Sequence, residues 1–120
     1  MENSNNEKQN NDEIIQLPII VSNSYIKKYY IDERLNVLPK EVKNTLRKIF
    51  EDYTKEVGGL VEVLFDNKEF DLVFKNYKDD TDYNYDEINA TYKLSKIERE
   101  YAELFSQVAQ FCKFKFNGLV

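Results

Sequence analysis

The clearest pattern along the chain is an apolar stripe at helical spacing that ends at a pair of glycines. Its members recur at intervals of three and four residues: Val42, Leu46, Ile49, Phe50, Tyr53 and Val57. This spacing places them on one face of an α-helix. Pro39 suits the first helical position, where its missing N–H would have no partner anyway. Gly58 and Gly59 suit the helix end, because glycine enters left-handed conformations without a Cβ clash. The pattern predicts a helix from 39 to 57.

Apolar and polar positions then alternate, which predicts a β-hairpin. The runs Leu60–Phe65 and Phe70–Tyr77 are separated by the polar turn 66–69. One hairpin face is fully apolar and takes Val61, Val63, Phe65, Phe70, Leu72 and Phe74. The opposite face is only half polar, because Leu60, Leu64 and Val73 stand among its charged residues. Since a lone two-stranded hairpin is marginal in water, we expect it to pack against helices.

Two further helices are predicted on either side of these elements. Ser24 is a suitable N-cap for a short helix from Tyr25 to about Glu33, in which Tyr25 and Tyr29 form an i,i+4 pair. A long helix is predicted from about Tyr85 to Phe114. Its expected apolar stripe is Ile88, Tyr92, Ile97, Tyr101, Leu104, Val108 and Phe111.

The expected fold class is therefore α+β with the order α-α-β-β-α, a two-stranded antiparallel hairpin packed against two longer helices and one short helix. Residues 1–13 are acidic and Asn-rich and are predicted to be a disordered tail. Residues 14–22 are apolar but contain Pro18, which favours a short edge strand or an arm that docks on the domain or on a second subunit. Residues 23–117 are expected to form one globular domain.

The amino-acid composition excludes most of the common catalytic and metal-binding sites. The chain has no His and only one Cys, so His-based triads and the common zinc and copper sites cannot be built. Three glycines cannot form a phosphate-binding loop. Asp80, Asp82 and Asn84 imitate the start of a calcium loop, but its required Gly and Glu are absent from the sixth and twelfth positions. We predict no enzymatic activity, no cofactor and no metal, and we expect Cys112 to be a buried, inert thiol.

Charge and hydropathy indicate the cellular compartment of the protein and exclude two classes of partner. A net charge of −5 disfavours nucleic acid, whose binding depends on clustered Lys and Arg. The first 13 residues lack the basic and apolar regions of a signal peptide, and no apolar run approaches the roughly 20 residues of a membrane span. These observations predict a cytoplasmic protein that binds neither nucleic acid nor membranes.

The remaining hypothesis is surface contact. Leu60, Leu64 and Val73, with Tyr25 and Tyr29, form the candidate interaction face, whereas Gly58, Gly59 and Pro39 are assigned structural roles. We predict a protein-interaction module that binds an unidentified protein or forms a homodimer, because exposed apolar strand surface invites pairing. The alternative is a small-ligand-binding protein or an enzyme that uses Asp, Glu and Tyr side chains in a groove between helices and hairpin.

Short motifs also resemble a small uncharacterised bacterial family, a domain of unknown function. They are Asn23-Ser24-Tyr25, Lys28-Tyr29-Tyr30, Leu38-Pro39, residues 54–59 (TKEVGG) and residues 85–88 (YDEI). The resemblance covers residues 22–116. It implies a cytoplasmic protein from a Gram-positive bacterium, and it implies no activity and no site.

Overall fold

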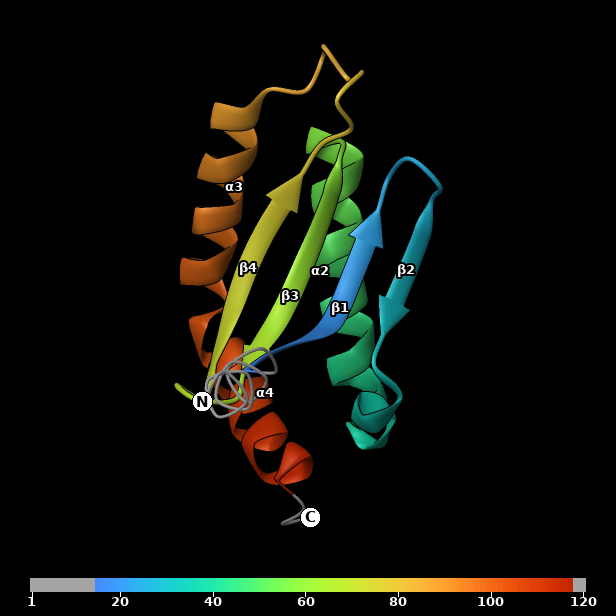
Figure 1. The fold of residues 1–120 in the computed structure, drawn as a ribbon. Coiled ribbons are helices and arrows are strands. Elements are labelled where there is room, and N and C mark those ends of the chain that lie inside the picture. The colour runs from blue at the N-terminus through green and yellow to red at the C-terminus, as the bar shows by residue number, and fades with distance from the viewer. Residues whose placement is uncertain (1–14, 118–120) are drawn as a thin grey trace, which may run out of the picture.

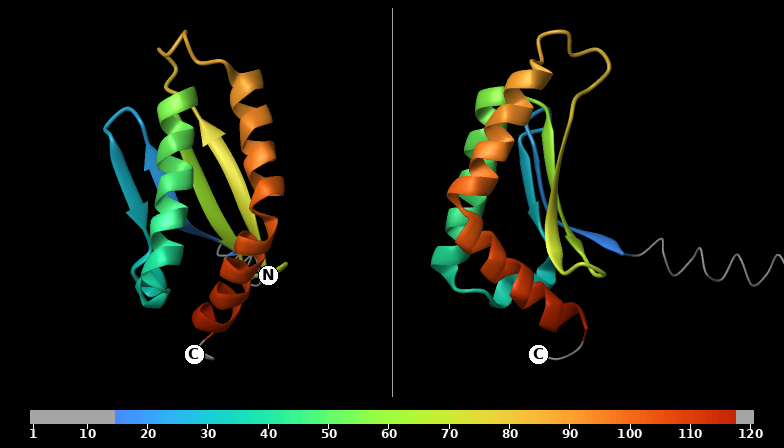
Figure 2. Two further views of the ribbon diagram at one scale, coloured as in Figure 1. Left: turned by 180° about the vertical axis from the view of Figure 1, so that it is seen from behind. Right: turned by 90° about the vertical axis from the view of Figure 1, so that its left-hand side faces the viewer.

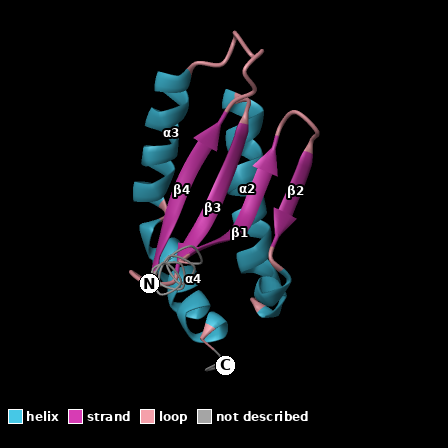
Figure 3. Cartoon of the chain, in the orientation of Figure 1, coloured by secondary structure: helices cyan, strands magenta, loops and turns pink. Residues whose placement is uncertain are grey.

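The sheet and its helices form two layers. The computed structural model describes residues 15–117, in which four antiparallel strands have the spatial order β2-β1-β3-β4. All three α-helices lie on one face of this sheet (Figures 1 and 3). The elements in chain order are β1 (Gln16–Asn23), β2 (Lys28–Ile31), the 3₁₀ helix η1 (Glu33–Val37), α2 (Lys40–Val57), β3 (Leu60–Asp66), β4 (Asp71–Tyr77), α3 (Glu87–Glu100) and α4 (Ala102–Phe116).

The α+β class and the central elements are confirmed. Helix α2 spans Lys40–Val57, one residue later than predicted at its start, because Pro39 is its N-cap rather than its first residue. Gly58 and Gly59 follow it with φ values of +81° and +68°. The hairpin is also confirmed, since β3 pairs with β4 from Leu60 opposite Tyr77 to Asp66 opposite Asp71.

The predicted order α-α-β-β-α is wrong, because the first helix does not exist. The segment from Tyr25 to Glu33 forms a turn and then strand β2, whose register sets Tyr30 opposite Val21 of β1. Lys-Tyr-Tyr-Ile is rich in the aromatic and β-branched residues that fit a pleated surface. Pairing with β1 therefore prevails over the local helical spacing of the tyrosines.

The apolar segment 14–22 supplies most of β1, which lies between β2 and β3 rather than at an edge or on a separate arm (Figure 1). Pro18 is accommodated at an irregularity, since the pairing with β3 shifts register between Pro18 and Ile20. A bulge of this kind tolerates a residue that cannot donate to the ladder. Ile19 and Ile20 beside it are buried. The predicted tail at 1–13 lies outside the described residues.

The predicted long helix is two helices that meet at Tyr101, whose backbone (φ −111°, ψ 26°) interrupts the helical path. In the first of them the expected stripe is wrong at Ile88 and Tyr92, whereas Ile97 packs against the core as predicted. Ile88 and Tyr92 are 85% and 60% exposed, while Ala90 and Leu94 face the core. After Tyr101 the chain changes direction (Figure 2), and Phe105, Val108 and Cys112 of α4 are buried in the core.

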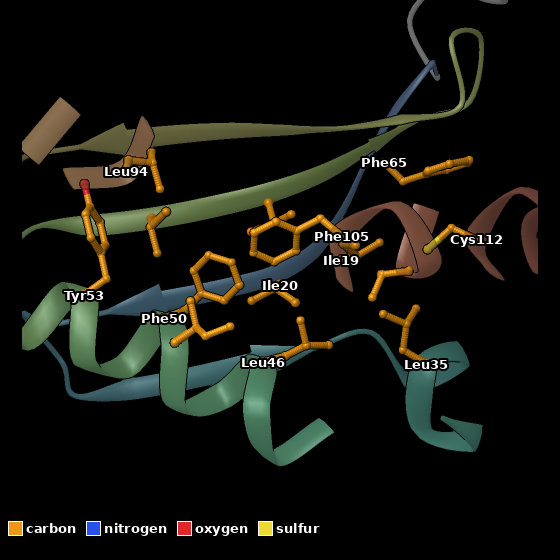
Figure 4. Close-up of a cluster of buried hydrophobic side chains, with 14 residues drawn as sticks. Ile19, Ile20, Leu35, Leu46, Phe50, Tyr53, Phe65, Leu94, Phe105 and Cys112 are labelled. Carbon is orange, nitrogen blue, oxygen red and sulfur yellow. The ribbon is translucent and has the colours of Figure 1, made fainter. Parts of the chain in front are cut away.

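The core lies between the sheet and the helices, where side chains from both layers meet (Figure 4). Its centre is aromatic: Phe50 of α2 lies 5.9 Å from Phe105 of α4, and Phe105 lies 4.9 Å from Phe74 of β4, between ring centroids. Tilted aromatic pairs at such distances are favourable beyond their area of burial. The helices thus cover one sheet face and leave the other as a candidate binding surface.

Candidate interaction surface

The sheet face opposite the helices is called here the open face. In the described part of the chain no helix packs against it (Figure 2). Strand register defines its members, because side chains alternate between the two faces. Val63 of β3 and Phe74 of β4 are paired and face the core. The residues directly before and after each of them along its strand therefore point to the open face. The open face contains Gln16, Pro18, Val21, Asn23, Lys28, Tyr30, Leu60, Glu62, Leu64, Asp66, Asp71, Val73, Lys75 and Tyr77.

Apolar and charged side chains alternate in rows across this face. One row runs Tyr30, Val21, Glu62 and Lys75 from β2 to β4. Tyr30 is 50% exposed. Cross-strand neighbours of this kind contact one another and are the unit of sheet stabilisation. This row therefore sets an apolar pair on β2 and β1 beside a charged pair on β3 and β4.

The next row brings together two of the residues predicted from the sequence. Leu64 stands opposite Val73 on one side and Pro18 on the other, and it is only 7% exposed. Leu60 lies in another row, opposite Tyr77, whose hydroxyl donates to the Glu62 carboxylate at 3.0 Å. Leu60, Leu64 and Val73 therefore share one face, as their alternation predicts.

Tyr29, the fourth predicted residue, lies on the opposite side of the sheet. Its ring packs toward α2, where the Arg47 guanidinium lies 5.2 Å from the ring centroid. Burial raises the pKa of Tyr29, and its hydroxyl has no hydrogen-bond partner among the described residues. Tyr29 therefore belongs to the interface between sheet and helix rather than to the open face.

Tyr25 lies in the β1–β2 turn, away from both faces. Its hydroxyl donates to Asp82 at 2.7 Å and accepts from the Asp79 backbone N–H at 2.9 Å. These bonds tie the turn to the loop that joins β4 to α3, so Tyr25 has a structural contact that the sequence does not reveal.

Sequence reasoning missed Val21, Tyr30 and Tyr77 as members of the open face. The signal was present in β2, because Lys28–Ile31 reads polar, aromatic, aromatic, apolar and can be placed on a strand as well as on a helix. Only the pairing of β2 with β1 decides between the two, and that pairing joins separate segments of the chain.

The sequence predicts a ligand or enzyme site in a groove between helices and hairpin; a hollow with Asp, Glu and Tyr side chains does occur, but no hairpin residue lines it. This hollow of about 320 Å³ lies between α2 and α3 and is lined by carboxylates, lysines and two tyrosines. Two of its three carboxylates are paired: Lys48 contacts Asp52 at 2.9 Å, and Lys93 contacts Glu56, while Glu100 is exposed. Exposed pairs of this kind neutralise charge and contribute little else.

The remaining chemical candidates are few. No cluster of three His, Cys, Asp or Glu that could hold a metal ion occurs in residues 15–117. Cys112 is fully buried, and burial raises the pKa of its thiol to about 12. None of the described helices combines the length and apolar character needed to cross a membrane.

The fold and the site define a small α+β domain with an antiparallel four-stranded sheet, helices on one sheet face, and mixed apolar and charged residues on the other. The chain belongs to DUF6145, a family of unknown function, whose model matches residues 16–119. This match confirms the resemblance to a domain of unknown function and extends it to include β1. Neither the curated proteins nor the solved structures contained a match.

Proposed function

We propose that this protein is a protein-interaction module and that two copies associate through their open faces. The observation that carries the proposal is the one-sided sheet, with Val21, Leu60 and Val73 half-buried and Tyr30 and Tyr77 about half exposed on the face away from the helices. Apolar residues placed this way mark contact surfaces on small domains.

The charges on the face favour a second copy as its partner. Lys28 and Lys75 stand on the same face as Glu62 and Asp71. A two-fold interface must be self-complementary, because the same patch meets itself. A face that carries both signs satisfies this condition, although the chain as a whole has a net charge of −5.

The area of the open face limits the affinity that we expect for the dimer. Strands of seven residues are about 23 Å long, and four strands are about 19 Å wide. The footprint is therefore about 400 Å² on each copy, which belongs to the range of weak and transient complexes rather than obligate dimers. We expect a dimer that forms reversibly at about micromolar to millimolar concentration.

Sedimentation velocity over a concentration series tests the proposal. Val73→Lys should raise the dimer dissociation constant by about tenfold or more, because it replaces an apolar contact next to Leu64 with an ammonium group that must lose water on association. Ile88→Lys is the matched control, since it makes the same kind of change at an 85% exposed position on α3. A wild-type monomer at every concentration, or equal effects of the two variants, would refute self-association.

The alternative of a small-ligand site or an enzyme has weaker support. Asp52 and Glu56 in the groove between α2 and α3 are engaged by lysines. A catalytic acid or base needs an environment that sets its protonation state for the reaction. The open face therefore has the better claim to function.

A further inference from the structure

A second surface lies at the outer edge of β4 and is separate from the open face. Strand β4 ends the sheet, so its outer side has no strand partner within residues 15–117. The right-hand view of Figure 2 faces this edge and shows α3 and α4 beside the strand, on the helix side, without crossing it over most of its length. An edge strand directs alternate backbone N–H and C=O groups outward, ready to pair with another extended chain.

A groove of about 380 Å³ runs along the inner side of this edge. Its strand wall is Phe70, Leu72 and Phe74, and its helix wall is one stripe of α4 that includes Phe105. Leu72 and Phe74 are alternate residues of β4 and therefore face the same side. A strand added beside β4 would place every second side chain in this groove.

The charged residues that line the groove differ between its two ends, with Glu98 at one end and both Asp71 and Lys113 at the other. Glu98 lines the end next to α3, and no Lys or Arg of the described chain lies within ion-pair distance of it. Lys113 lines the groove beyond Phe105 on α4, and its ammonium group lies 4.8 Å from the centroid of the Phe70 ring. Partial burial raises the pKa of Glu98, which agrees with a carboxylate that has lost water without gaining a cation.

We propose that β4 and the groove beside it bind an extended peptide of a partner protein by strand addition, with an apolar side chain over Phe74 and Phe105 and a Lys or Arg at Glu98. Main-chain hydrogen bonds to β4 supply affinity, and the groove selects the side chains. Glu98 and Phe105 are seven residues apart, on α3 and α4 on either side of the break at Tyr101, so the helical rise sets their separation along the helices at about 10 Å or less. At about 3.3 Å per residue of extended chain, the basic residue stands two or four positions from the apolar one.

The position of α3 beyond the edge of the sheet favours a peptide rather than a second folded copy as the partner of β4. Helix α3 lies beyond β4 on the helix side in Figure 1, where the helices of a second domain added edge to edge would also have to lie. A single extended segment has no helix layer of its own and avoids that overlap. The occupant is therefore expected to be a flexible or terminal segment of its protein.

Selection from a phage-displayed library of random dodecapeptides tests the proposal with the full-length chain. The expected result is a consensus with one bulky apolar residue and a Lys or Arg two or four positions away. A synthetic consensus peptide should protect the β4 amides from hydrogen exchange. N-methylation of alternate residues, at one of the two parities, should weaken its binding at least tenfold because it removes the main-chain donors.

Matched variants locate the site. Ser106→Arg extends a long cation into the groove from an exposed position and should weaken peptide binding at least tenfold, whereas Gln107→Arg, exposed on α4 outside the groove, should leave it unchanged. Glu98→Gln should weaken binding about twofold to fivefold, the usual range for exposed ion pairs. Failure to select a consensus, indifference to N-methylation at both parities, or equal effects of the two arginine variants would overturn strand addition at β4. Val73→Lys on the open face separates this result from the dimer, because it should disrupt self-association and, at protein concentrations at which the wild type is monomeric, leave the peptide affinity unchanged.

Discussion

Replacing Gly59 by alanine tests the packing where α2 ends and β3 begins. A Cβ atom at Gly59 would lie 2.5 Å from the Tyr77 carbonyl oxygen and 2.7 Å from Cε1 of Tyr85. The first of these atoms is backbone of the paired strand β4 and cannot move without disturbing the hairpin. The residue also has φ of +68°, which an L side chain rarely adopts.

The expected cost has two parts. The left-handed backbone costs about 1–2 kcal/mol for alanine, and relief of the overlap costs about 1–3 kcal/mol, as for other overpacked sites. Gly59→Ala should therefore lower the free energy of unfolding by about 2–5 kcal/mol. At roughly 4 °C per kcal/mol for a chain of this length, Tm should fall by about 8–20 °C.

Gly58→Ala is the matched control, because the same substitution one residue earlier meets no overlap. A Cβ atom at Gly58 would have only Cδ1 of Tyr85 nearby, at 3.9 Å, which is ordinary contact. Its φ of +81° and ψ of −168° still favour glycine, at a cost of about 1–3 kcal/mol. Urea and thermal unfolding followed by circular dichroism measure both variants. If Gly59→Ala is no more destabilising than Gly58→Ala, the close approach of Tyr77 and Tyr85 is refuted.

Three further predictions concern buried and partly buried groups. Tyr53→Phe should lower the free energy of unfolding by about 1–2 kcal/mol, since the Tyr53 hydroxyl donates to the Ala90 carbonyl at 2.8 Å and accepts from Asn76 at 3.3 Å. The control Tyr92→Phe, at an exposed position, should change the free energy of unfolding by less than about 0.5 kcal/mol. Equal effects of the two variants in urea unfolding would contradict the hydrogen bonds of Tyr53. Hydrogen bonds from Arg34 hold the pKa of Asp32 below its ordinary 3.8 in the folded state, so the stabilisation of the fold by the Asp32 carboxylate is complete above that pH and is lost as the pH falls further. Asp32→Asn should therefore have a lower free energy of unfolding than the wild type at neutral pH, and this difference should shrink in acid. A difference in stability that does not depend on pH would argue against an ionic origin. The Cys112 thiol, buried and with a pKa raised to about 12, should react with a thiol reagent at pH 8 only as fast as the protein opens, so rapid reaction of the folded protein would show that the α4 packing is wrong.

Local signals explain which elements could be predicted from the sequence. Helix α2 has a continuous stripe, and Gly58 and Gly59 mark its end within a few residues. The hairpin likewise has its alternation and its turn in one stretch of chain. Both elements could be assigned because all the information lies close together in the sequence.

The errors arose where distant pairing decides the structure. Strand β2 has only four residues and exists because β1 pairs with it, whereas its tyrosines alone also fit helical spacing. Pro18 made β1 look like an edge or an arm, although a register shift admits it inside the sheet. The break at Tyr101 left no signal in the sequence, because the apolar spacing stays at three or four residues from Ile97 through Tyr101 and Leu104 to Val108.

The candidate site shows the same division. Leu60, Leu64 and Val73 lie on one face because the period of two is a local property of the hairpin. Tyr25 and Tyr29 were grouped with them on the assumption of a helix, and the strand places Tyr29 against α2 and leaves Tyr25 in a turn. Tyr30 was the tyrosine that belonged to the open face, and only the register with Val21 reveals it.

The alternation along β4 lets one strand contribute to two surfaces. Val73 and Lys75 point to the open face, while Leu72 and Phe74 point to the groove beside α4. Adjacent residues of β4 therefore lie on different surfaces, and by the two proposals they would contact different partners. If both proposals hold, an added peptide strand would widen the sheet and enlarge the open face by about one strand width, about 4.8 Å. Peptide binding should then strengthen self-association, and by thermodynamic reciprocity dimerisation should tighten peptide binding by the same factor.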